Sequence, residues 1–302
     1  MRQYLHGVAH DRVVLDDYDS PFRSETLPIA GGAPGMPPGD AGFWTRMKAE
    51  YSDREIVELS MCLGSWIAFG RLVEETLGMR TIYARRPHRV IAPGVDTALF
   101  RPDREAGART RASQGWMDGD PPVVGYLGRF VPEKGIGTLM RALDACTQPW
   151  RALFVGGGPM EAEVRAWAAR HGGRVRIATG VAHDAVPGYL NAMDLLCAPS
   201  RTTRRWHEQL GRMLTEAMAC GVPVVGSDSG EIPFVVADAG LIVPEDDVAA
   251  WTREIDALLA APSRRAVLAT RGRARAEAEF ALDVVARQHL DFFDELIGQP
   301  TT

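Results

Sequence analysis

Short apolar runs alternate with longer amphipathic stretches from about Pro121 to the end of the chain. The intervening stretches have helical spacing, as in the apolar stripe of Thr138, Leu139, Ala142 and Leu143. Alternating strands and helices predict a parallel sheet covered by helices on both faces. Ligands bind such sheets beyond the carboxyl ends of the strands, so we expect functional residues in the loops that follow them. The expected strands are Val123–Leu127, Ala152–Val155, Arg174–Ala178, Asp194–Ala198, Val222–Val225 and Gly240–Val243.

The first hundred residues have a less regular pattern. Pro28–Gly42 contains five glycines and four prolines, which predicts a loop. The expected elements around it are strands at Arg12–Leu15, Glu55–Leu59 and Val90–Ile91 and a helix at Gly64–Leu77.

The tail from Trp251 to Gly298 has a helical pattern throughout. Its arginine-rich middle, Arg264 to Arg275, predicts a solvated helix face.

Composition limits the classes of protein that fit this pattern. The 302 residues suit two domains, and 46% hydrophobic with 24% charged residues is the average of soluble globular proteins. A net charge of −5 argues against a general nucleic-acid binder. Four scattered cysteines without a CxxC pair indicate a reduced compartment. The polar residues 1–20 leave no room for the apolar region of a signal peptide, and the longest apolar uncharged run has 12 residues, so we expect a cytoplasmic protein.

The loop after the first predicted buried strand carries an unusual pair of cations. Only two of the 34 basic residues are lysines, and one of them, Lys134, lies in Gly128–Gly135 with Arg129. A flat guanidinium and a compact ammonium, with four residues between them, suit a diphosphate. An ordinary surface loop is the alternative.

A glycine run, Gly156–Pro159, follows the second strand and would let the backbone approach a ligand closely. It does not match the dinucleotide pattern GxGxxG, whose third glycine would fall at Glu161.

A helix is expected from about Gly211 to Gly221, with Glu208 in the turn before it and Glu216 on it. The free N–H groups of Gln209 to Arg212 would form an anion site at its positive end. A carboxylate beside that site can accept hydrogen bonds from two neighbouring hydroxyls of a sugar or ribose. For either glutamate alone, a solvated helix face is the alternative.

These motifs together closely resemble the group 1 glycosyltransferases, a family of retaining enzymes with the GT-B fold. The resemblance covers about Val90 to Pro244. It rests on Arg129-x4-Lys134, Gly156-Gly-Gly-Pro, Glu208-x7-Glu216 before Ala-Met-Ala-x-Gly-x-Pro-Val-Val, Asp228–Pro233 and Pro93–Pro102.

The resemblance implies an α/β protein of GT-B type. We expect one complete doubly wound parallel-sheet (Rossmann-like) C-terminal domain, plus an abbreviated N-terminal α/β domain, since nothing before Arg12 matches the first strand and glycine-rich loop of the family. The expected divisions are an acceptor-side domain at 1–98, a nucleotide-sugar domain at 99–277 and a final helix at 278–302 that packs back on the N-terminal part.

The resemblance also implies roles for individual residues. Arg129 and Lys134 would clamp the diphosphate, Glu208 would hold hydroxyls of the donor sugar, and Glu216 would hold the ribose diol. The backbone near Val181 would meet the base. Further donor-binding positions are expected at Gly128, Gly157, Gln209, Leu210 and Gly211. Asp17 and Asp19 resemble the metal-binding DxD of the other glycosyltransferase fold, but polar residues at a strand end explain them better, and an acceptor-side role is the weaker expectation.

The expected function is transfer of a sugar from a nucleotide-diphosphate sugar to a sugar, lipid or small-molecule acceptor, with retention of configuration. No metal or other cofactor and no nucleic-acid partner is expected. Arginines at 80–89 would permit peripheral contact with a membrane, although an interdomain hinge or plain surface explains them as well. Two alternatives stay open: an inactive donor-binding remnant or subunit that needs a partner, and, with less support, a nucleotide-sugar epimerase.

Overall fold

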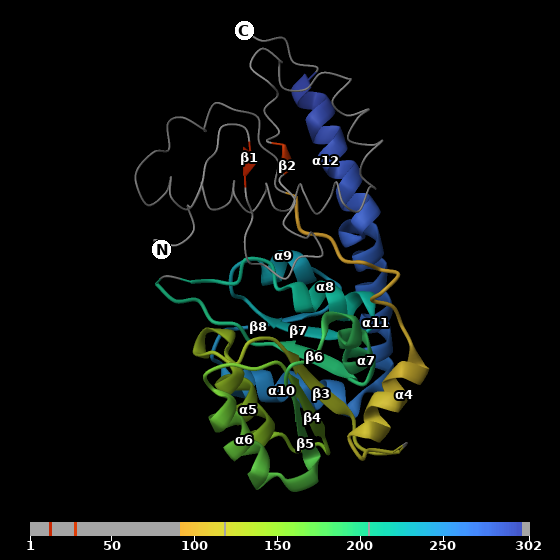
Figure 1. Cartoon of the computed structure of the whole chain (residues 1–302). Coiled ribbons are helices and arrows are strands. Elements are labelled where there is room, and N and C mark those ends of the chain that lie inside the picture. The colour runs from red at the N-terminus through yellow and green to blue at the C-terminus, as the bar shows by residue number, and fades with distance from the viewer. Residues whose placement is uncertain (1–11, 14–26, 29–90, 118, 205, 298–302) are drawn as a thin grey trace. The chain divides into compact units, whose positions relative to one another are not determined.

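A computed structural model describes residues 12–13, 27–28, 91–117, 119–204 and 206–297 of the chain (Figure 1). The chain divides into two compact units, one of residues 1–89 with 289–302 and one of residues 90–288. In the first unit, strand β1 (Arg12–Val13) pairs antiparallel with β2 (Leu27–Pro28). The expected elements at Glu55–Leu59 and Gly64–Leu77 lie outside the described residues. The predicted boundaries at residues 98 and 277 stay predictions.

The second unit is built on a six-stranded parallel sheet with the order β5-β4-β3-β6-β7-β8. The α/β fold and its parallel sheet were predicted from the hydrophobic pattern, and both are confirmed. The strand ends differ from the expected ones by at most two residues, as in β7, which is shifted two residues toward the C-terminus. The strands are β3 (Val123–Leu127), β4 (Arg151–Val155), β5 (Val175–Ala178), β6 (Leu195–Ala198), β7 (Val224–Ser227) and β8 (Leu241–Val243).

Neighbouring residues of each strand point to opposite faces of this sheet, and side chains on both faces are buried. Val123 of β3 belongs to one hydrophobic cluster and Val124 to the other. Leu153 and Phe154 of β4 divide in the same way. This alternation explains why the strands are almost continuously apolar in sequence.

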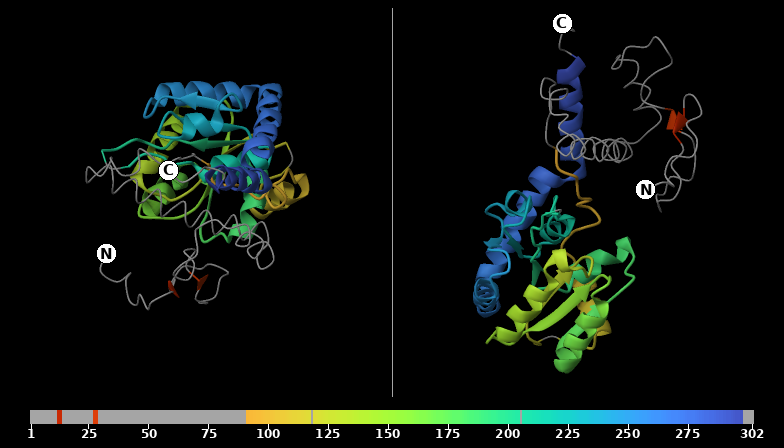
Figure 2. Two further views of the ribbon diagram at one scale, coloured as in Figure 1. Left: turned by 90° about the horizontal axis from the view of Figure 1, so that it is seen from above. Right: turned by 90° about the vertical axis from the view of Figure 1, so that its left-hand side faces the viewer.

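Helices cover the two faces of the sheet (Figures 1 and 2). The cluster around Phe154 includes Leu139 of α5, Trp167 of α6 and Trp251 of α10, whereas the cluster around Leu153 includes Leu214 of α8. The α-helices are α4 (Arg104–Ser113), α5 (Ile136–Ala145), α6 (Glu161–Arg170), α7 (Val186–Asn191), α8 (Arg212–Ala219), α9 (Ile232–Val236), α10 (Val248–Ala260), α11 (Pro262–Arg275) and α12 (Leu282–Ile297). Short 3-10 turns η1 (Pro132–Lys134), η2 (Gly172–Arg174) and η3 (His183–Ala185) and a π-helical turn η4 (Ala276–Phe280) complete them.

The prediction of a solvated arginine face at Arg264–Arg275 is wrong at its C-terminal end. Arg273 donates to the carbonyl oxygens of Phe100, at 2.9 Å, and of Ala219. Ala219 is the last residue of α8, where carbonyl groups lack partners within the helix and attract a cation. Arg275 donates in the same way to the carbonyl of Val235 at 2.9 Å.

The segment before α4 was expected to contain a strand at Val90–Ile91. Val90 lies outside the described residues, and Ile91 is not in a strand. Instead, Val95 forms an isolated bridge with Ala281, its amide donating to the carbonyl of Phe280 at 2.7 Å. Hydrogen bonds of this kind depend on a residue far along the chain, which local hydrophobic patterning does not reveal.

Candidate functional site

The candidate site lies where the strand order of the parallel sheet reverses. The chain runs outward from β3 through β4 to β5, then returns to β6 on the other side of β3 and runs outward through β7 to β8. The loops after β3 and β6 therefore leave the carboxyl edge next to each other, and this crevice is where open α/β sheets bind ligands. These loops contain Lys134 and Glu208.

The two loops pack tightly against each other. The amide of Arg201 donates to the carbonyl of Glu133 at 2.8 Å. Gly135 has a φ of 65°, and a Cβ atom at this position would lie 1.7 Å from the carbonyl oxygen of Pro199. Only glycine fits here without a rearrangement, so the close approach of the loops is built into the sequence.

Lys134 and Glu208 form a largely buried ion pair at the centre of the site. The Nζ atom of Lys134 lies 2.6 Å from Oε2 of Glu208, and the two side chains are 14% and 7% exposed. The hydroxyl of Ser200 donates to the same oxygen at 2.7 Å. Among the described residues, Oε1 of Glu208 has no hydrogen-bond partner. Lys134 also lies over the ring of Trp206, 5.0 Å from its centroid.

The backbone of Glu208 is fixed by the turn that follows β7. Its carbonyl accepts a hydrogen bond from the amide of Glu231 at 2.9 Å. Gly230 has a φ of 53°, and a Cβ atom there would lie 2.0 Å from the same carbonyl oxygen. Three loops, after β3, β6 and β7, thus hold one carboxylate in place.

Glu216 lies one turn into α8 and is buried. Burial raises the pKa of its carboxyl group to about 7, and the charge of Arg212, 3.6 Å away, only partly opposes this shift. The alternative of a solvated helix face is therefore wrong for this residue. A buried acid that titrates near neutrality is typical of functional sites.

The start of α8 follows Gly211, which has a φ of 73° and is buried. No side chain caps this helix N-terminus. Gln209 is exposed and Leu210 is half-buried against the hydrophobic core. The anion site expected at these amides stays a prediction.

Arg129 and Gly128 lie on the loop after β3. The Arg129 side chain is 67% exposed, and its nearest acidic partner, Glu133, is 3.9 Å away. Its backbone is held by the buried hydroxyl of Tyr126, which donates to the Arg129 carbonyl at 2.7 Å. Burial, together with the nearby charge of Glu208, raises the pKa of Tyr126, so this hydroxyl stays a donor. The backbone of Arg129 is thus fixed, while its side chain is exposed and, among the described residues, has only a long ion pair with Glu133.

The glycines after β4 serve mainly the neighbouring loop. A Cβ atom at Gly156 would lie 1.9 Å from the carbonyl oxygen of Gly128, and one at Gly158 would lie 2.7 Å from that of Phe130. Gly157 differs, because its nearest neighbour would be a carboxylate oxygen of Glu161 at 3.8 Å. Only Gly157 is thus left open toward a ligand.

The remaining predicted positions are spread out. Val181 is half-buried and packs against the core. Asp17 and Asp19 lie outside the described residues. The sequence did not single out Ser200 or Trp206, although a serine two residues after the end of a buried strand was an available signal for Ser200.

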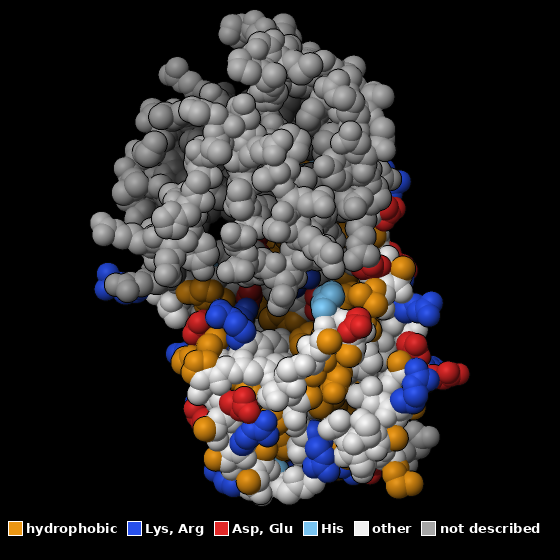
Figure 3. Space-filling view, in the orientation of Figure 1, with side chains coloured by type: hydrophobic (Ala, Val, Ile, Leu, Met, Phe, Trp, Pro, Cys, Tyr) orange, Lys and Arg blue, Asp and Glu red, His pale blue; other side chains and the backbone are white. Residues whose placement is uncertain are grey.

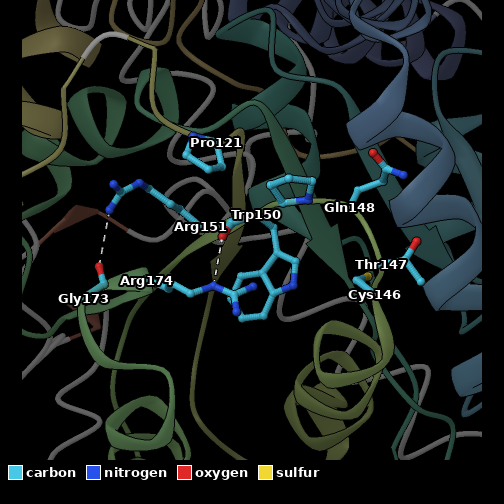
Figure 4. Close-up of a pocket in the computed structure, with 9 residues that line it drawn as sticks. Pro121, Cys146, Thr147, Gln148, Trp150, Arg151, Gly173 and Arg174 are labelled. Atoms are coloured by element: carbon cyan, nitrogen blue, oxygen red, sulfur yellow. Dashed lines mark hydrogen bonds between the residues drawn. The ribbon is translucent and has the colours of Figure 1, made fainter.

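A hollow of about 620 Å³ lies at the opposite, amino edge of the same sheet (Figure 4). The Arg174 guanidinium lies against the ring of Trp150, 3.9 Å from its centroid, while Arg151 pairs with Asp120 at 2.6 Å. The Nε atom of Arg151 is buried without a hydrogen-bond partner. This hollow contains none of the predicted site residues, and it lies away from the strand ends where such sheets bind ligands.

The surface of the described unit mixes both signs of charge with hydrophobic side chains (Figure 3). Within the described part of the chain, every helix is too short or too polar to cross a lipid bilayer.

Comparison with known proteins agrees with the geometry of the parallel sheet. Residues 110–275, more than half of the chain, match the family model described as glycosyl transferases group 1. The chain belongs to this family.

Two curated relatives illustrate the similarity. The GDP-mannose-dependent alpha-(1-6)-phosphatidylinositol monomannoside mannosyltransferase of Mycolicibacterium smegmatis is 40% identical over 192 residues, which are 61% of this chain and 50% of the relative. The lipopolysaccharide core biosynthesis mannosyltransferase LpsB of Rhizobium meliloti is 32% identical over 74% of this chain and 65% of its own length. The chain thus spans about half to two thirds of these relatives.

The solved structure of sucrose-phosphate synthase from Thermosynechococcus elongatus superimposes with a TM-score of 0.61 and 31% identity. The match covers 74% of this chain and 56% of that one. Together with the six-stranded parallel sheet, it places the described domain among the GT-B glycosyltransferases.

Proposed function

We propose that this chain takes part in transfer of a sugar from a nucleotide-diphosphate sugar to an acceptor, with retention of configuration and without a metal ion. The observation that carries the proposal is the Lys134–Glu208 pair at the reversal of strand order, with one carboxylate oxygen left open. GDP-mannose is the first donor to test, because the relative that is 40% identical is a GDP-mannose-dependent mannosyltransferase.

In this proposal, cations bind the diphosphate. Lys134 lies in the crevice, and the exposed side chain of Arg129, on the same loop, can reorient toward a diphosphate bound there. The α8 N-terminus, which no side chain caps, adds amide donors from the other side. Departure of a nucleoside diphosphate builds negative charge on its oxygens, and fixed cations with helix amides stabilise that charge in the transition state. The same groups would supply what a metal ion otherwise provides.

The two glutamates would bind hydroxyl pairs. Oε1 of Glu208 is available to the donor sugar, and Glu216, deeper in α8, would accept hydrogen bonds from the ribose diol. Neutral hydroxyls bind more strongly to an ionised carboxylate, so nucleotide binding would draw Glu216 toward its charged form.

Calorimetric titration of GDP into the 302-residue chain tests the assignment. We expect Glu216→Ala and Arg129→Ala to weaken GDP binding by about 10-fold or more, which corresponds to the loss of a hydrogen bond to a charged group. The circular dichroism spectrum of each variant should match that of the parent chain. The matched controls are Glu105→Ala and Arg109→Ala on the exposed face of α4, which should leave the affinity unchanged. Unchanged affinity in both site variants would contradict the proposal.

Metal independence has its own test. Release of GDP from GDP-mannose by the full chain, with water as the acceptor of the mannosyl group, should continue at the same rate in excess EDTA. Loss of release in EDTA and its recovery with magnesium would refute a cation-only leaving-group site.

A further inference from the structure

Ser200 is fully buried and lies two residues after β6, at the carboxyl edge of the sheet. Its hydroxyl donates to Oε2 of Glu208 at 2.7 Å, the oxygen that Lys134 also contacts. Both hydrogen bonds of the carboxylate therefore fall on one oxygen. Among the described residues nothing pairs with Oε1, so the carboxylate is held through one oxygen and the other is left for a ligand.

Ser200 is better suited than Lys134 to fix this orientation. The lysine has a flexible four-carbon stem and three donors, and the proposed function requires it at the diphosphate. The serine side chain is short, and the hydroxyl of Ser227, itself buried, donates to the Ser200 carbonyl at 2.6 Å. A buried carboxylate must keep a donor when its cation turns toward another anion. Ser200 is the group placed to supply it.

We propose that Ser200 is a positioning residue for the donor sugar, which holds Oε2 of Glu208 so that Oε1 can accept hydrogen bonds from the hydroxyls of that sugar. The inference rests on the proposed function, because it assigns Glu208 to the sugar. It predicts that Ser200 acts on the sugar and not on the nucleotide. A merely structural serine would affect both or neither.

The test compares GDP with GDP-mannose on the full chain. In Ser200→Ala, the affinity for GDP should stay within about twofold of the parent, while kcat/KM for GDP release from GDP-mannose falls about 10-fold, as expected for loss of one hydrogen bond to a charged group. Ser200→Cys has a side chain of similar volume with a weaker hydrogen-bond donor, so it should lower kcat/KM by less than Ser200→Ala does. It also serves if the alanine variant does not fold.

Ser229→Ala is the matched control. Ser229 is as fully buried as Ser200, but its hydroxyl bonds to Thr202, 3.1 Å away, and not to Glu208. Ser229→Ala should change neither kcat/KM for GDP-mannose relative to GDP affinity nor GDP affinity itself. A small effect on stability would not alter this expectation.

The outcomes separate the two proposals. Equal losses for GDP and GDP-mannose in folded Ser200 variants, or no loss for either, would overturn the positioning role while the proposed function stands. Failure of the parent chain to bind GDP, GDP-mannose, UDP or UDP-glucose would overturn the proposed function and the positioning role with it.

Discussion

The two edges of the sheet from β3 to β8 use charged residues in different ways. At the amino edge, Arg151 is neutralised by Asp120 and Arg174 lies on the face of Trp150. At the carboxyl edge, Glu208 keeps one oxygen without a partner among the described residues, and Glu216 is buried with a raised pKa. A carboxyl group whose pKa burial has raised opposes folding when it is ionised, so the place of Glu216 at the carboxyl edge is better explained by a ligand than by stability.

Glycines differ between the edges in the same sense. At Gly119 and Gly172 a Cβ atom would meet nothing within 4 Å, so these turns need glycine only for its positive φ. At Gly135, Gly156 and Gly230 a Cβ atom would lie 2.0 Å or less from a backbone carbonyl oxygen. At these three positions the loops of the carboxyl edge are packed backbone to backbone, whereas Gly180 after β5 is open, so the close packing is confined to the loops that frame Lys134 and Glu208.

The largest expected effect comes from breaking this packing. Gly135→Ala should lower the free energy of unfolding by about 3 kcal/mol or more, because it adds backbone strain to a collision with Pro199. Gly172→Ala, with a similar φ but open space, should lower it by about 1 kcal/mol. Urea unfolding of both variants measures the difference. Equal losses would mean that the two edges are packed alike.

The second effect concerns the buried acid. Because folding raises the pKa of Glu216 from 4.5 to about 7, the folded state resists ionisation. The unfolded chain ionises first, so stability falls as pH rises from about 4.5 to about 7 and then levels off. Glu216→Gln should therefore stabilise the unliganded protein by about 2–3 kcal/mol at pH 8 and hardly change it at pH 4.

Thermal or urea unfolding at the two pH values measures this effect, with Glu105→Gln on the exposed side of α4 as control. The same Glu216→Gln variant should bind GDP more weakly and should lack the rise in GDP affinity that we expect of the parent chain between pH 6 and 8. If the difference in unfolding free energy between Glu216→Gln and the parent chain were the same at both pH values, the burial of an ionisable carboxyl group would be contradicted.

The smallest expected changes in stability distinguish Arg129 at the carboxyl edge from Arg174 at the amino edge. Arg129→Ala should weaken GDP binding about 10-fold and leave the free energy of unfolding within about 0.5 kcal/mol, because its side chain is 67% exposed. Arg174→Ala should lower that free energy by about 1 kcal/mol through loss of its contact with Trp150, and leave GDP affinity unchanged. Calorimetry and urea unfolding together measure both. The comparison of the edges fails if the two variants exchange these effects.

Hydrophobic patterning predicted the six strands and their parallel arrangement, because a strand buried on both faces has a distinctive apolar run. It also placed Lys134 and Glu208 at the same edge, since both follow strands. Their direct contact was not predictable. Glu208 ends an irregular segment after β6 whose path depends on Gly135, Pro199 and Gly230, and these belong to three different loops.

Two errors have the same cause. Arg273 was expected in solvent, but it caps carbonyl groups at the end of α8, more than fifty residues earlier in the chain. For Glu216 the alternative of a solvated helix face is wrong for the same reason, because neighbouring elements cover this residue. Helical periodicity tells which residues share a face and does not tell whether a polar face is later covered.

The most direct measurement is a crystal structure of the full chain with GDP-mannose. The diphosphate should lie at the carboxyl edge within hydrogen-bond distance of Lys134 and Arg129, with Glu216 on the ribose and Oε1 of Glu208 on the mannose. A ligand in the hollow beside Trp150 and Arg174, with the carboxyl edge unoccupied, would contradict this assignment.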